Sequence, residues 1–460
     1  MTEVTDNLAA LTFWYEFYYD VYPNQFQYLW KIKQLHEQYG PIVCINPIHI
    51  HIHDPDYFET IYTSGTHKRN RCSWCMHEGA SSFGSGMLET MDHDLHKMRR
   101  SAGTSYFSKR SAQELAPSVV GKVFKLLDRL KNDTGKIVNL NDAMAALTMD
   151  VISGYCFGEA MGYLENPEYA KEWLDMLHGG IQIRPIGRQF PWLINTLLDL
   201  PPWIAVYLSP AAAIMGELHL GILRRIEKIR DEEASPDKLK ATDHEKKPHR
   251  LMTEGQTFVA AGTETTARTL SVTTYSLLKS MDGREKLKEE LWKGLPERTL
   301  PVSLPQWEAL LYLSAVINEG LRVAHGVSSR QPLITTHEEL QYEQWTIPRG
   351  TPVMESLYLI HMDPDISPEP FAFRPECWIE NPKLTKYLFA FSRGSRGCLG
   401  MNLAISELYV AMAYLFRTLE MEIYNTVEAR DVLTTNDCFV GMKDLKSDDM
   451  KVKVLGEVKG

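Results

Sequence analysis

The chain has 460 residues, of which 44% are hydrophobic and 23% are charged, as in an average globular protein. This composition excludes a disordered, collagen-like or coiled-coil chain, and the length is sufficient to bury a core that encloses a large cofactor. Lys and Arg total 49 against 59 Asp and Glu, a formal net charge of −10, which argues against a nucleic-acid binder. The 7 Cys residues are too few for a disulfide scaffold and indicate a reducing compartment.

The start of the chain, residues 1–30, is rich in aromatic side chains, which distinguishes this segment from residues 31–460. Glu16, Asp20 and Pro23 interrupt it, so it predicts neither a spanning helix nor a cleavable signal peptide. Its rings either contact a membrane surface or, as we favour, pack on the body of the protein. With no membrane anchor visible, we expect a chain that is free in solution or bound at a membrane surface.

The first half of the chain after this segment predicts short strands followed by helices. Residues 41–53 alternate in the manner of strands, whereas 86–135 contain few helix breakers. Four prolines interrupt the apolar region 190–215, which therefore predicts two short helices with a loop between them. The polar stretch 231–249 predicts an exposed connection.

The second half is dominated by helices. A long helix is predicted from Pro248 to about Leu278, because residues of one face recur every seven positions, at Leu251, Phe258, Thr265 and Val272. Helical patterns continue to Arg322, a turn-rich segment with short strands follows to Glu380, and a last helix is predicted over 400–416. We therefore expect a mainly α fold with a minor β sheet, in a single large domain.

A glycine-rich loop with one cysteine, residues 391–400, precedes this last helix. Its glycines at 394, 397 and 400 predict positive φ angles and a close approach of the backbone to a flat partner. Cys398 can receive backbone N–H hydrogen bonds and the positive end of the following helix, which stabilise a thiolate. A thiolate suits a haem iron, where it favours O–O cleavage, and Arg396 suits an anionic group such as a haem propionate.

Polar residues also stand in the middle of the long helix, in the sequence AAGTETT. Threonine in such a place can bond to the carbonyl four residues back, and Gly262 leaves space above a cofactor. Thr265 could donate a hydrogen bond to bound dioxygen, while Glu264 could supply protons from the solvent side. The pattern thus favours oxygen chemistry on this face of the helix.

These segments resemble the cytochrome P-450 family. Its cysteine-loop pattern F-x-x-G-x-R-x-C-x-G is matched at Phe391, Gly394, Arg396, Cys398 and Gly400. Its [AG]-G-x-[DE]-T-[TS] motif is complete at residues 261–266, and its E-x-x-R and [WH]-x-x-x-R motifs are matched by two further pairs, Glu319 with Arg322 and His96 with Arg100. The resemblance covers about residues 13–456, with the motifs in the family's order.

The resemblance implies the P-450 fold around haem b, with Cys398 as the iron ligand and Glu264 and Thr265 as catalytic residues. It implies cofactor-binding roles for the remaining motif residues, His96, Arg100, Arg330, Phe391, Gly394, Arg396 and Gly400. Glu319 and Arg322 would support the cysteine side of the core. Substrate contacts are expected from Phe258, Ala261 and four segments, 72–90, 183–210, 327–329 and 438–440.

The sequence around Glu319 and Cys398 is most similar to that of fungal members of secondary metabolism, near the trichodiene-oxygenase type. This implies a monooxygenase that inserts one oxygen atom from dioxygen into an apolar terpenoid, alkaloid or polyketide. Electrons would come from NADPH through a P-450 reductase, on the cytoplasmic face of the endoplasmic reticulum. A basic patch that suits docking of an acidic electron donor is predicted from Lys97, Arg99, Lys109, Arg110 and Arg393.

Two departures from the family pattern motivate an alternative, a degenerate or poorly haem-loaded paralogue. Cys377 occupies the place of an Arg that joins the Glu319–Arg322 network, so we expect Cys377→Arg to raise haem occupancy. The stretch before Pro248 is also shorter than usual. A second alternative is a haem enzyme that rearranges an oxygenated substrate without dioxygen, although such members often lack the acid–alcohol pair.

A third alternative is a zinc protein. His49, His51 and His53 alternate along a predicted strand and so share one face, and Cys72 and Cys75 have a metal-like spacing. The second half of a structural zinc site is missing, which weighs against this alternative.

Overall fold

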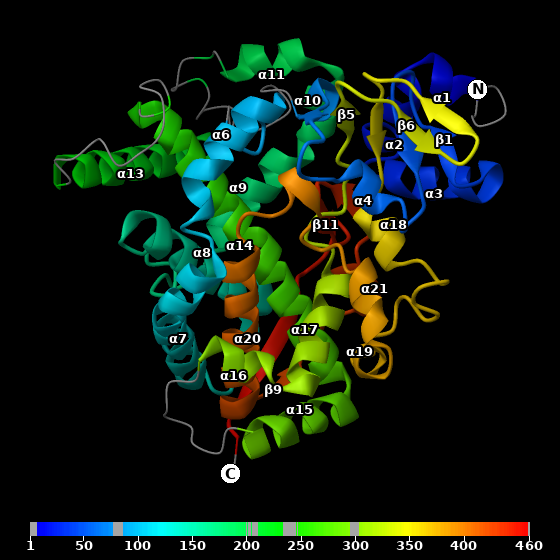
Figure 1. Ribbon diagram of the computed structural model, residues 1–460. Coiled ribbons are helices and arrows are strands. Elements are labelled where there is room, and N and C mark those ends of the chain that lie inside the picture. Colours follow the sequence, from blue (N-terminus) through cyan, green and yellow to red (C-terminus); the bar gives the residue numbers. More distant parts are fainter. Residues whose placement is uncertain are drawn as a thin grey trace.

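The structure, a computed structural model, describes residues 7–76, 86–198, 200, 204, 210–232, 245, 247–294 and 303–458. Helices dominate it, as the sequence predicted (Figure 1). The helices are α1 Asn7–Leu11, α2 Trp14–Asp20, α3 Tyr28–Tyr39, α4 Phe58–Ile61, α5 Ser73–Met76, α6 His93–Thr104, α7 Lys109–Asn132, α8 Leu140–Phe157, α9 Lys171–Gln182, α10 Arg184–Gln189, α11 Pro191–Leu198, α13 Pro210–Glu232, α14 Pro248–Lys279, α15 Met281–Gly294, α16 Leu304–Glu308, α17 Leu311–Ala324, α18 Leu357–His361, α19 Glu376–Glu380, α20 Met401–Thr418 and α21 Glu428–Asp431.

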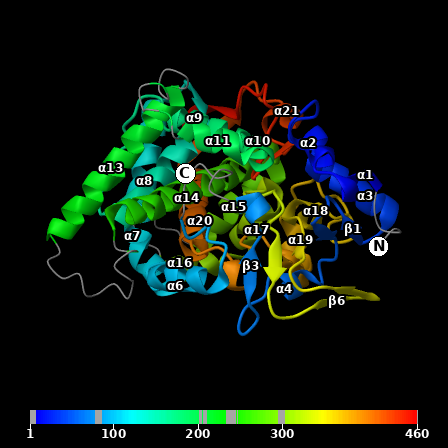
Figure 2. The same cartoon turned by 90° about the horizontal axis from the view of Figure 1, so that it is seen from above.

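The strands form small sheets beside the helical body. They are β1 Ile42–Cys44, β2 Ile50–Ile52, β3 Arg69–Arg71, β4 Ile137–Asn139, β5 Leu333–Thr335, β6 Leu340–Tyr342, β7 Trp345–Ile347, β8 Pro352–Met354, β9 Leu419–Ile423, β10 Asn436–Cys438, β11 Val440–Met442 and β12 Lys451–Glu457. The predicted strand region 41–53 becomes β1 and β2, antiparallel with Ile42 opposite Ile52. They belong to a five-stranded sheet of order β1-β2-β8-β5-β3, which lies with α1–α4 at one side of the molecule (Figure 2).

The long predicted helix is α14, which crosses the middle of the helical body against α8, α17 and α20 (Figure 1). Its threonines are compatible with burial because their hydroxyls bond to carbonyls four residues back, as from Thr257 to Thr253 and from Thr263 to Val259. A Cβ on Gly262 would lie 2.9 Å from Cγ1 of Ile152, so glycine permits close packing of α14 on α8.

The other predicted helices are also present where the structure describes them. The last one is α20, directly after the cysteine loop. In the region 190–215, α11 and the first residues of α13 are helical, whereas most of the predicted loop between them lies outside the described residues. Most of the predicted connection 231–249 also lies outside them.

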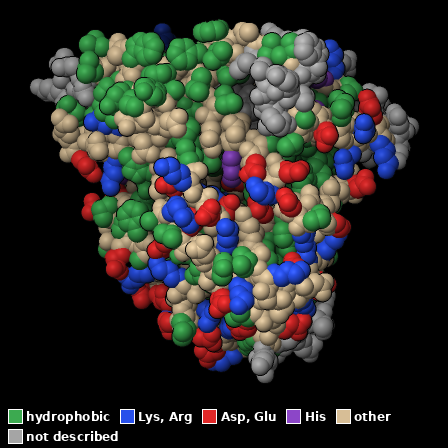
Figure 3. Space-filling model, turned by 180° about the vertical axis from the view of Figure 1, so that it is seen from behind, with side chains coloured by type: hydrophobic (Ala, Val, Ile, Leu, Met, Phe, Trp, Pro, Cys, Tyr) green, Lys and Arg blue, Asp and Glu red, His purple; other side chains and the backbone are tan. Residues whose placement is uncertain are grey.

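The aromatic start of the chain has two faces. Phe26 and Tyr28 are buried against the body, whereas Trp14 and Tyr22 are 62% and 71% exposed. Figure 3 shows hydrophobic side chains gathered along the upper edge of the molecule, the edge that carries α1, α2 and α11 in Figure 1. Within the described part of the chain, no helix combines the length and the apolar character needed to cross a bilayer.

Candidate active site

A cavity of about 290 Å³ lies between α14 and the cysteine loop. Its walls are largely apolar. They bring together segments that are far apart in the sequence, including the loop residues Phe391, Arg396, Cys398 and Gly400 and the α14 residues Phe258, Ala261, Gly262, Glu264 and Thr265. The two motifs that the sequence singled out therefore line the same cavity.

The cysteine loop is held by backbone hydrogen bonds. The N–H of Cys398 donates to the carbonyl of Phe391 at 2.8 Å, and Arg100 from α6 donates to the carbonyl of Gly397 at 2.7 Å. Burial raises the pKa of the Cys398 thiol above its ordinary value, although a hydrogen bond from the Gly400 N–H and the charge of Arg100 act in the opposite direction. The loop by itself therefore does not stabilise the thiolate, contrary to the expectation from the sequence. The sulfur opens into the cavity, where a metal ion could bind it as a thiolate.

Only one of the three loop glycines has the expected positive φ. Gly394 has φ +70°, and a Cβ there would lie 2.2 Å from the carbonyl oxygen of Thr63. The expectation was wrong for Gly397 and Gly400, whose φ angles are −58° and −84°. Of the three positions, only 394 thus requires glycine, because its φ is positive and the loop packs tightly on residues 62–63.

Four cationic or imidazole side chains gather at the cavity, namely Arg71, His96, Arg100 and Arg396. Burial and the neighbouring charges of Arg71 and Arg100 lower the pKa of Arg396 to about 9, although Asp92 raises it. Burial and the charges of Arg396, Arg71 and Arg100 lower the pKa of His96 to about 2. Among the described residues, Nδ1 of His96 and Nε of Arg396 are buried without a hydrogen-bond partner. These groups fit an anionic ligand.

The residues present therefore fit haem b. An apolar cavity would suit the macrocycle, the Cys398 sulfur could bind the iron, and the cationic cluster would suit the propionates. The sequence had indicated His96, Arg100 and Arg396 for this purpose. It missed Arg71, which comes from β3 and whose Nη1 also donates to Oε1 of Gln331 at 2.7 Å. A lone Arg in an edge strand carries no sequence signal that separates it from a surface residue.

Thr265 and Glu264 lie on the cavity side of α14. The hydroxyl of Thr265 donates to the carbonyl of Ala261 at 2.9 Å, the back-bond expected from the sequence. Glu264 is paired across to α9, where Nε2 of His178 lies 3.0 Å from its Oε1. His178 is a second residue that the sequence did not reveal, because its relation to Glu264 depends on how α9 crosses α14.

The charge of Glu264 is stabilised despite its burial. Burial raises the pKa of this carboxyl, but His178 lowers it by charge and by hydrogen bonding, and Arg268 and Lys443 lower it further. The net result is a pKa below the ordinary value. Glu264 is thus an ionised carboxylate in the wall of the cavity at neutral pH.

Glu319 and Arg322 form the buried pair that their spacing predicted. Arg322 donates to both carboxylate oxygens of Glu319, at 2.7 and 2.8 Å. Cys377 does not leave this network without a further donor, because two other groups donate to Glu319. The N–H of Arg374 donates to Oε1 of Glu319 at 2.8 Å, and the indole N–H of Trp378 donates to Oε2 at 2.9 Å.

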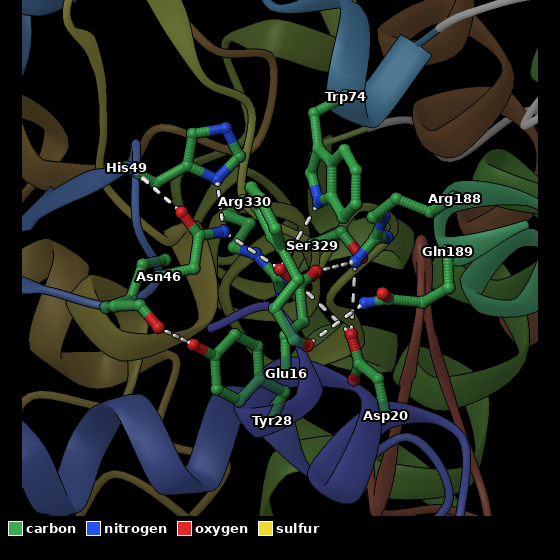
Figure 4. Close-up of polar contacts among 12 residues, drawn as sticks. Glu16, Asp20, Tyr28, Asn46, His49, Trp74, Arg188, Gln189, Ser329 and Arg330 are labelled. Atoms are coloured by element: carbon green, nitrogen blue, oxygen red, sulfur yellow. Dashed lines mark hydrogen bonds and ion pairs between the residues drawn. The ribbon is translucent and has the colours of Figure 1, made fainter. Parts of the chain in front are cut away.

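Arg330 differs from its expected role. Its guanidinium is directed to Glu16 and Asp20 of α2, and it is not among the residues that line the cavity (Figure 4). Two carboxylates thus compensate the charge of Arg330 at contact distance. The segment 72–90 contributes Met87 and Leu88 to the cavity. The other expected contacts that line the cavity are Phe258, Ala261, Val327, Phe439 and Val440.

The zinc alternative is wrong for the described residues. His49 contacts Asn46 and the sulfur of Cys72, whereas His51 contacts His36 and Ser356, so the histidines do not converge. No group of three or more His, Cys, Asp or Glu residues in the described part of the chain is arranged to hold a metal ion. The side chain of Cys75 lies outside the described residues.

A mainly helical fold that encloses such a cavity, with one cysteine opposite an acid–alcohol pair, defines the haem-thiolate class of enzymes. The cytochrome P450 family model matches residues 14–447, and the chain belongs to this family.

Curated relatives match almost the whole chain. The cytochrome P450 monooxygenase ucsK of Acremonium sp is 37% identical over 98% of this chain and 92% of its own length. The cytochrome P450 monooxygenases TRI4 of Trichoderma arundinaceum and Fusarium sporotrichioides are 36% and 38% identical, over 98% and 92% of this chain and 90% and 84% of their own lengths. The similarity to fungal monooxygenases of the TRI4 type is thereby confirmed, and the chain is a cytochrome P450 monooxygenase.

Proposed function

We propose that this protein inserts one oxygen atom from dioxygen into an apolar secondary metabolite, with electrons from NADPH delivered by a reductase. The observation that carries the proposal is that Cys398, Glu264 and Thr265 line one cavity. When haem is bound, its iron supplies the oxidising chemistry. A rearrangement without dioxygen is the less favoured reaction, since it needs no acid–alcohol pair.

The chain's own residues would hold the cofactor and manage protons. Cys398 would bind the iron, and Arg71, His96, Arg100 and Arg396 would bind the propionates. Glu264 passes protons inward to the hydroxyl of Thr265, which holds a proton at its Oγ for the reaction. His178 is one-fifth exposed and bonded to Glu264, so it offers a connection from solvent to this carboxylate.

The apolar lining of the cavity supports the proposed substrate class. Leu177, Ile181, Phe258, Val327 and Phe439 present apolar surface there, so a hydrocarbon-rich terpenoid, alkaloid or polyketide suits the cavity better than a charged metabolite. The names of the TRI4 relatives support the same class of enzyme but not a particular substrate.

Two surfaces suit the partners that such an enzyme needs. The exposed apolar side chains of α1, α2 and α11, which include Leu11, Trp14 and Trp192, suit contact with a membrane surface. The basic patch expected on the cysteine side is less suited to docking a reductase than the sequence suggested, because most of its positive charges are paired with acidic side chains. Four of its five cations have an acidic neighbour: Arg99 with Glu245, Lys109 with Glu308, Arg110 with Glu114 and Arg393 with Glu59.

The test is a carbon-monoxide difference spectrum of the purified, reduced protein. We expect the red-shifted absorption band of a thiolate-bound haem, its loss in Cys398→Ala, and its retention in the matched control Cys377→Ala. Cys377 is a suitable control because it also lies on the cysteine side but outside the cavity. A protein that stays colourless when hemin is supplied, or a band that survives Cys398→Ala, contradicts the proposal.

A further inference from the structure

Helix α2 buries two carboxylates on the face opposite its exposed aromatic residues. Glu16 and Asp20 are spaced i to i+4, so they share one helical face, and they are 0% and 3% exposed. Figure 4 shows both side chains directed into the protein, toward groups from several other elements. Two buried charges are tolerated only where opposite charges and hydrogen bonds compensate them.

Two guanidinium groups supply this compensation. Nη1 of Arg188, from α10, lies 2.6 Å from Oε1 of Glu16 and 3.1 Å from Oδ2 of Asp20. Nη2 of Arg330, from the segment after α17, contacts the same two oxygens. Burial raises the pKa of Glu16, but Arg330 and Arg188 bring it down to about 2. Burial raises the pKa of Asp20 to about 6 despite the same two arginines, so at neutral pH both carboxylates face the guanidinium groups as anions.

The second oxygen of Glu16 joins further elements to the cluster. Its Oε2 accepts hydrogen bonds from Nδ2 of Asn46 at 2.8 Å and from the indole N–H of Trp74 at 3.3 Å. The ring of Phe13 stacks on Trp74 with centroids 4.1 Å apart. One carboxylate therefore connects α2 with α5, with α10 and with the segment that carries Arg330.

These connected segments adjoin the wall of the cavity. Leu177 and Ile181 line it from α9, which leads directly into α10. Val327 and Gln331 line it on either side of Arg330 in the chain. Phe439 completes this part of the wall, and its N–H donates to Oγ of Ser329 at 2.9 Å.

The four charged residues of the cluster do not themselves line the cavity. Any effect on a bound molecule must pass through the segments they hold. We propose that Glu16 and Asp20 are positioning residues that fix this wall and so set which substrates fit. The inference rests on the proposed function only in taking the cavity as the substrate site.

The physical reason is that the two arginines share the same acceptor oxygens. If Glu16 loses its charge, the two guanidinium groups lose a buried carboxylate that they share and that compensates their charges. Their repulsion would displace α10 and the segment 326–331 relative to each other, while α14 and the cysteine loop keep their own contacts. The shape of the wall should change, and the cofactor site should not.

The experiment compares the holoenzyme with Glu16→Gln, Asp20→Asn and a control, Glu420→Gln. The control removes a partly buried ion pair, with Lys288, that joins α15 to β9 at the opposite end of the molecule (Figure 1). Absorbance titrations give the dissociation constants of imidazole and of the bulky azole clotrimazole. For Glu16→Gln we expect about a fivefold or larger change for clotrimazole and less than about a twofold change for imidazole. Glu420→Gln should change neither.

A second measurement needs no cofactor. Hydrogen exchange of the backbone amides in 184–189 and 326–331 should become roughly tenfold faster in Glu16→Gln, while amides of β9 stay unchanged. Asp20→Asn, which leaves Glu16 in place, should give a smaller effect of the same kind. Equal changes for both azoles, or unaltered exchange in both segments, overturns the inference. A protein without haem would instead contradict the proposed function, and the exchange data would still test this one.

Discussion

His178 on α9 and Glu264 on α14 are joined by a hydrogen bond of 3.0 Å at the wall of the cavity. The pair links a histidine near the surface to the carboxylate that precedes Thr265. It makes the ionisation of Glu264 dependent on a residue from another helix, because burial alone would raise the pKa of this carboxyl.

We expect His178→Gln to raise the pKa of Glu264, since the variant removes the neighbour that lowers it most. Glu264 should then lose its charge, and with it the supply of protons, at a higher pH than in the unchanged protein. The acid limb of the pH–kcat profile therefore moves to higher pH. The loss of kcat should be roughly ten- to hundredfold at the pH where Glu264 becomes protonated. Infrared titration of the carboxyl band, with Glu264→Gln as the reference, measures the pKa directly.

His219→Gln is the matched control for this prediction. His219 also bonds to α14, with its Nε2 2.7 Å from Oε1 of Gln256, but neither residue lines the cavity. His219→Gln should not shift the pH–kcat profile. An identical shift in both variants would show that the effect does not pass through Glu264.

Trp378 takes over a role that the sequence assigned to a missing arginine. Trp378→Phe keeps the ring but removes the donor to Oε2 of Glu319. Leaving this buried carboxylate with one fewer donor should lower the free energy of unfolding by about 1–3 kcal/mol. Chemical denaturation measures the difference, and Trp192→Phe, at a side chain that is 66% exposed, should change it little.

The same network alters the expectation for Cys377→Arg. The two oxygens of Glu319 already accept four hydrogen bonds, from Arg322 twice, from Arg374 and from Trp378. A carboxylate offers about four acceptor sites, so an added guanidinium would find none free. We now expect haem occupancy and melting temperature to stay unchanged. A clear gain in haem per protein would show that the indole is an inferior donor.

Gly394→Ala should disrupt the cysteine loop. The substitution forces a Cβ to within 2.2 Å of a backbone oxygen at a φ of +70°. Strain and overpacking together should cost more than about 2 kcal/mol, and haem should be lost in proportion. Gly121→Ala is the control, because a Cβ in that place on α7 meets nothing within 4 Å. Retention of full haem content in Gly394→Ala would contradict the prediction.

The buried histidines of the sheet should make the fold sensitive to acid. Nδ1 of His36 lies 2.9 Å from the carbonyl of Gly40, which can only accept, so His36 carries its proton on Nδ1. Its Nε2 then accepts from Nδ1 of His51, 2.7 Å away, and Nε2 of His51 accepts from the hydroxyl of Ser356. Burial lowers the pKa of both histidines, so both rings are neutral in the fold at neutral pH, consistent with this arrangement.

Burial lowers the pKa of His36 to about 4 from an ordinary value of 6.5. A group whose pKa is lowered by folding contributes stability above its unfolded pKa, and this contribution is lost as pH falls through the folded value. We expect the free energy of unfolding to fall between pH 6.5 and pH 4, by at most about 1.4 kcal/mol per pH unit for this group. In His36→Gln, the free energy of unfolding should depend less steeply on pH. His249→Gln, at an exposed position, should leave this pH dependence unchanged.

Much of the fold was predictable because its signals are local. The prolines that begin α14 and α11, the alternation in 41–53 and the glycine-rich loop before α20 each determine structure within a few residues. The cavity was predictable for the same reason, since Cys398 and Glu264 stand in short motifs. What could not be predicted depends on tertiary contacts. Trp378 compensates for Cys377 through a helix turn on α19, and Arg330 finds its partners at Glu16 and Asp20, more than three hundred residues away in the chain.

The carboxylates of α2 also constrain how the protein can be shortened. Removal of the aromatic start of the chain is an obvious way to improve solubility. None of the sequence motifs argues against a recombinant form that begins after Asp20. Such a form would lack Glu16 and Asp20, which both pair with Arg188 and Arg330, while retaining the arginines. Trimming should therefore stop before Phe13, whose ring also covers Trp74.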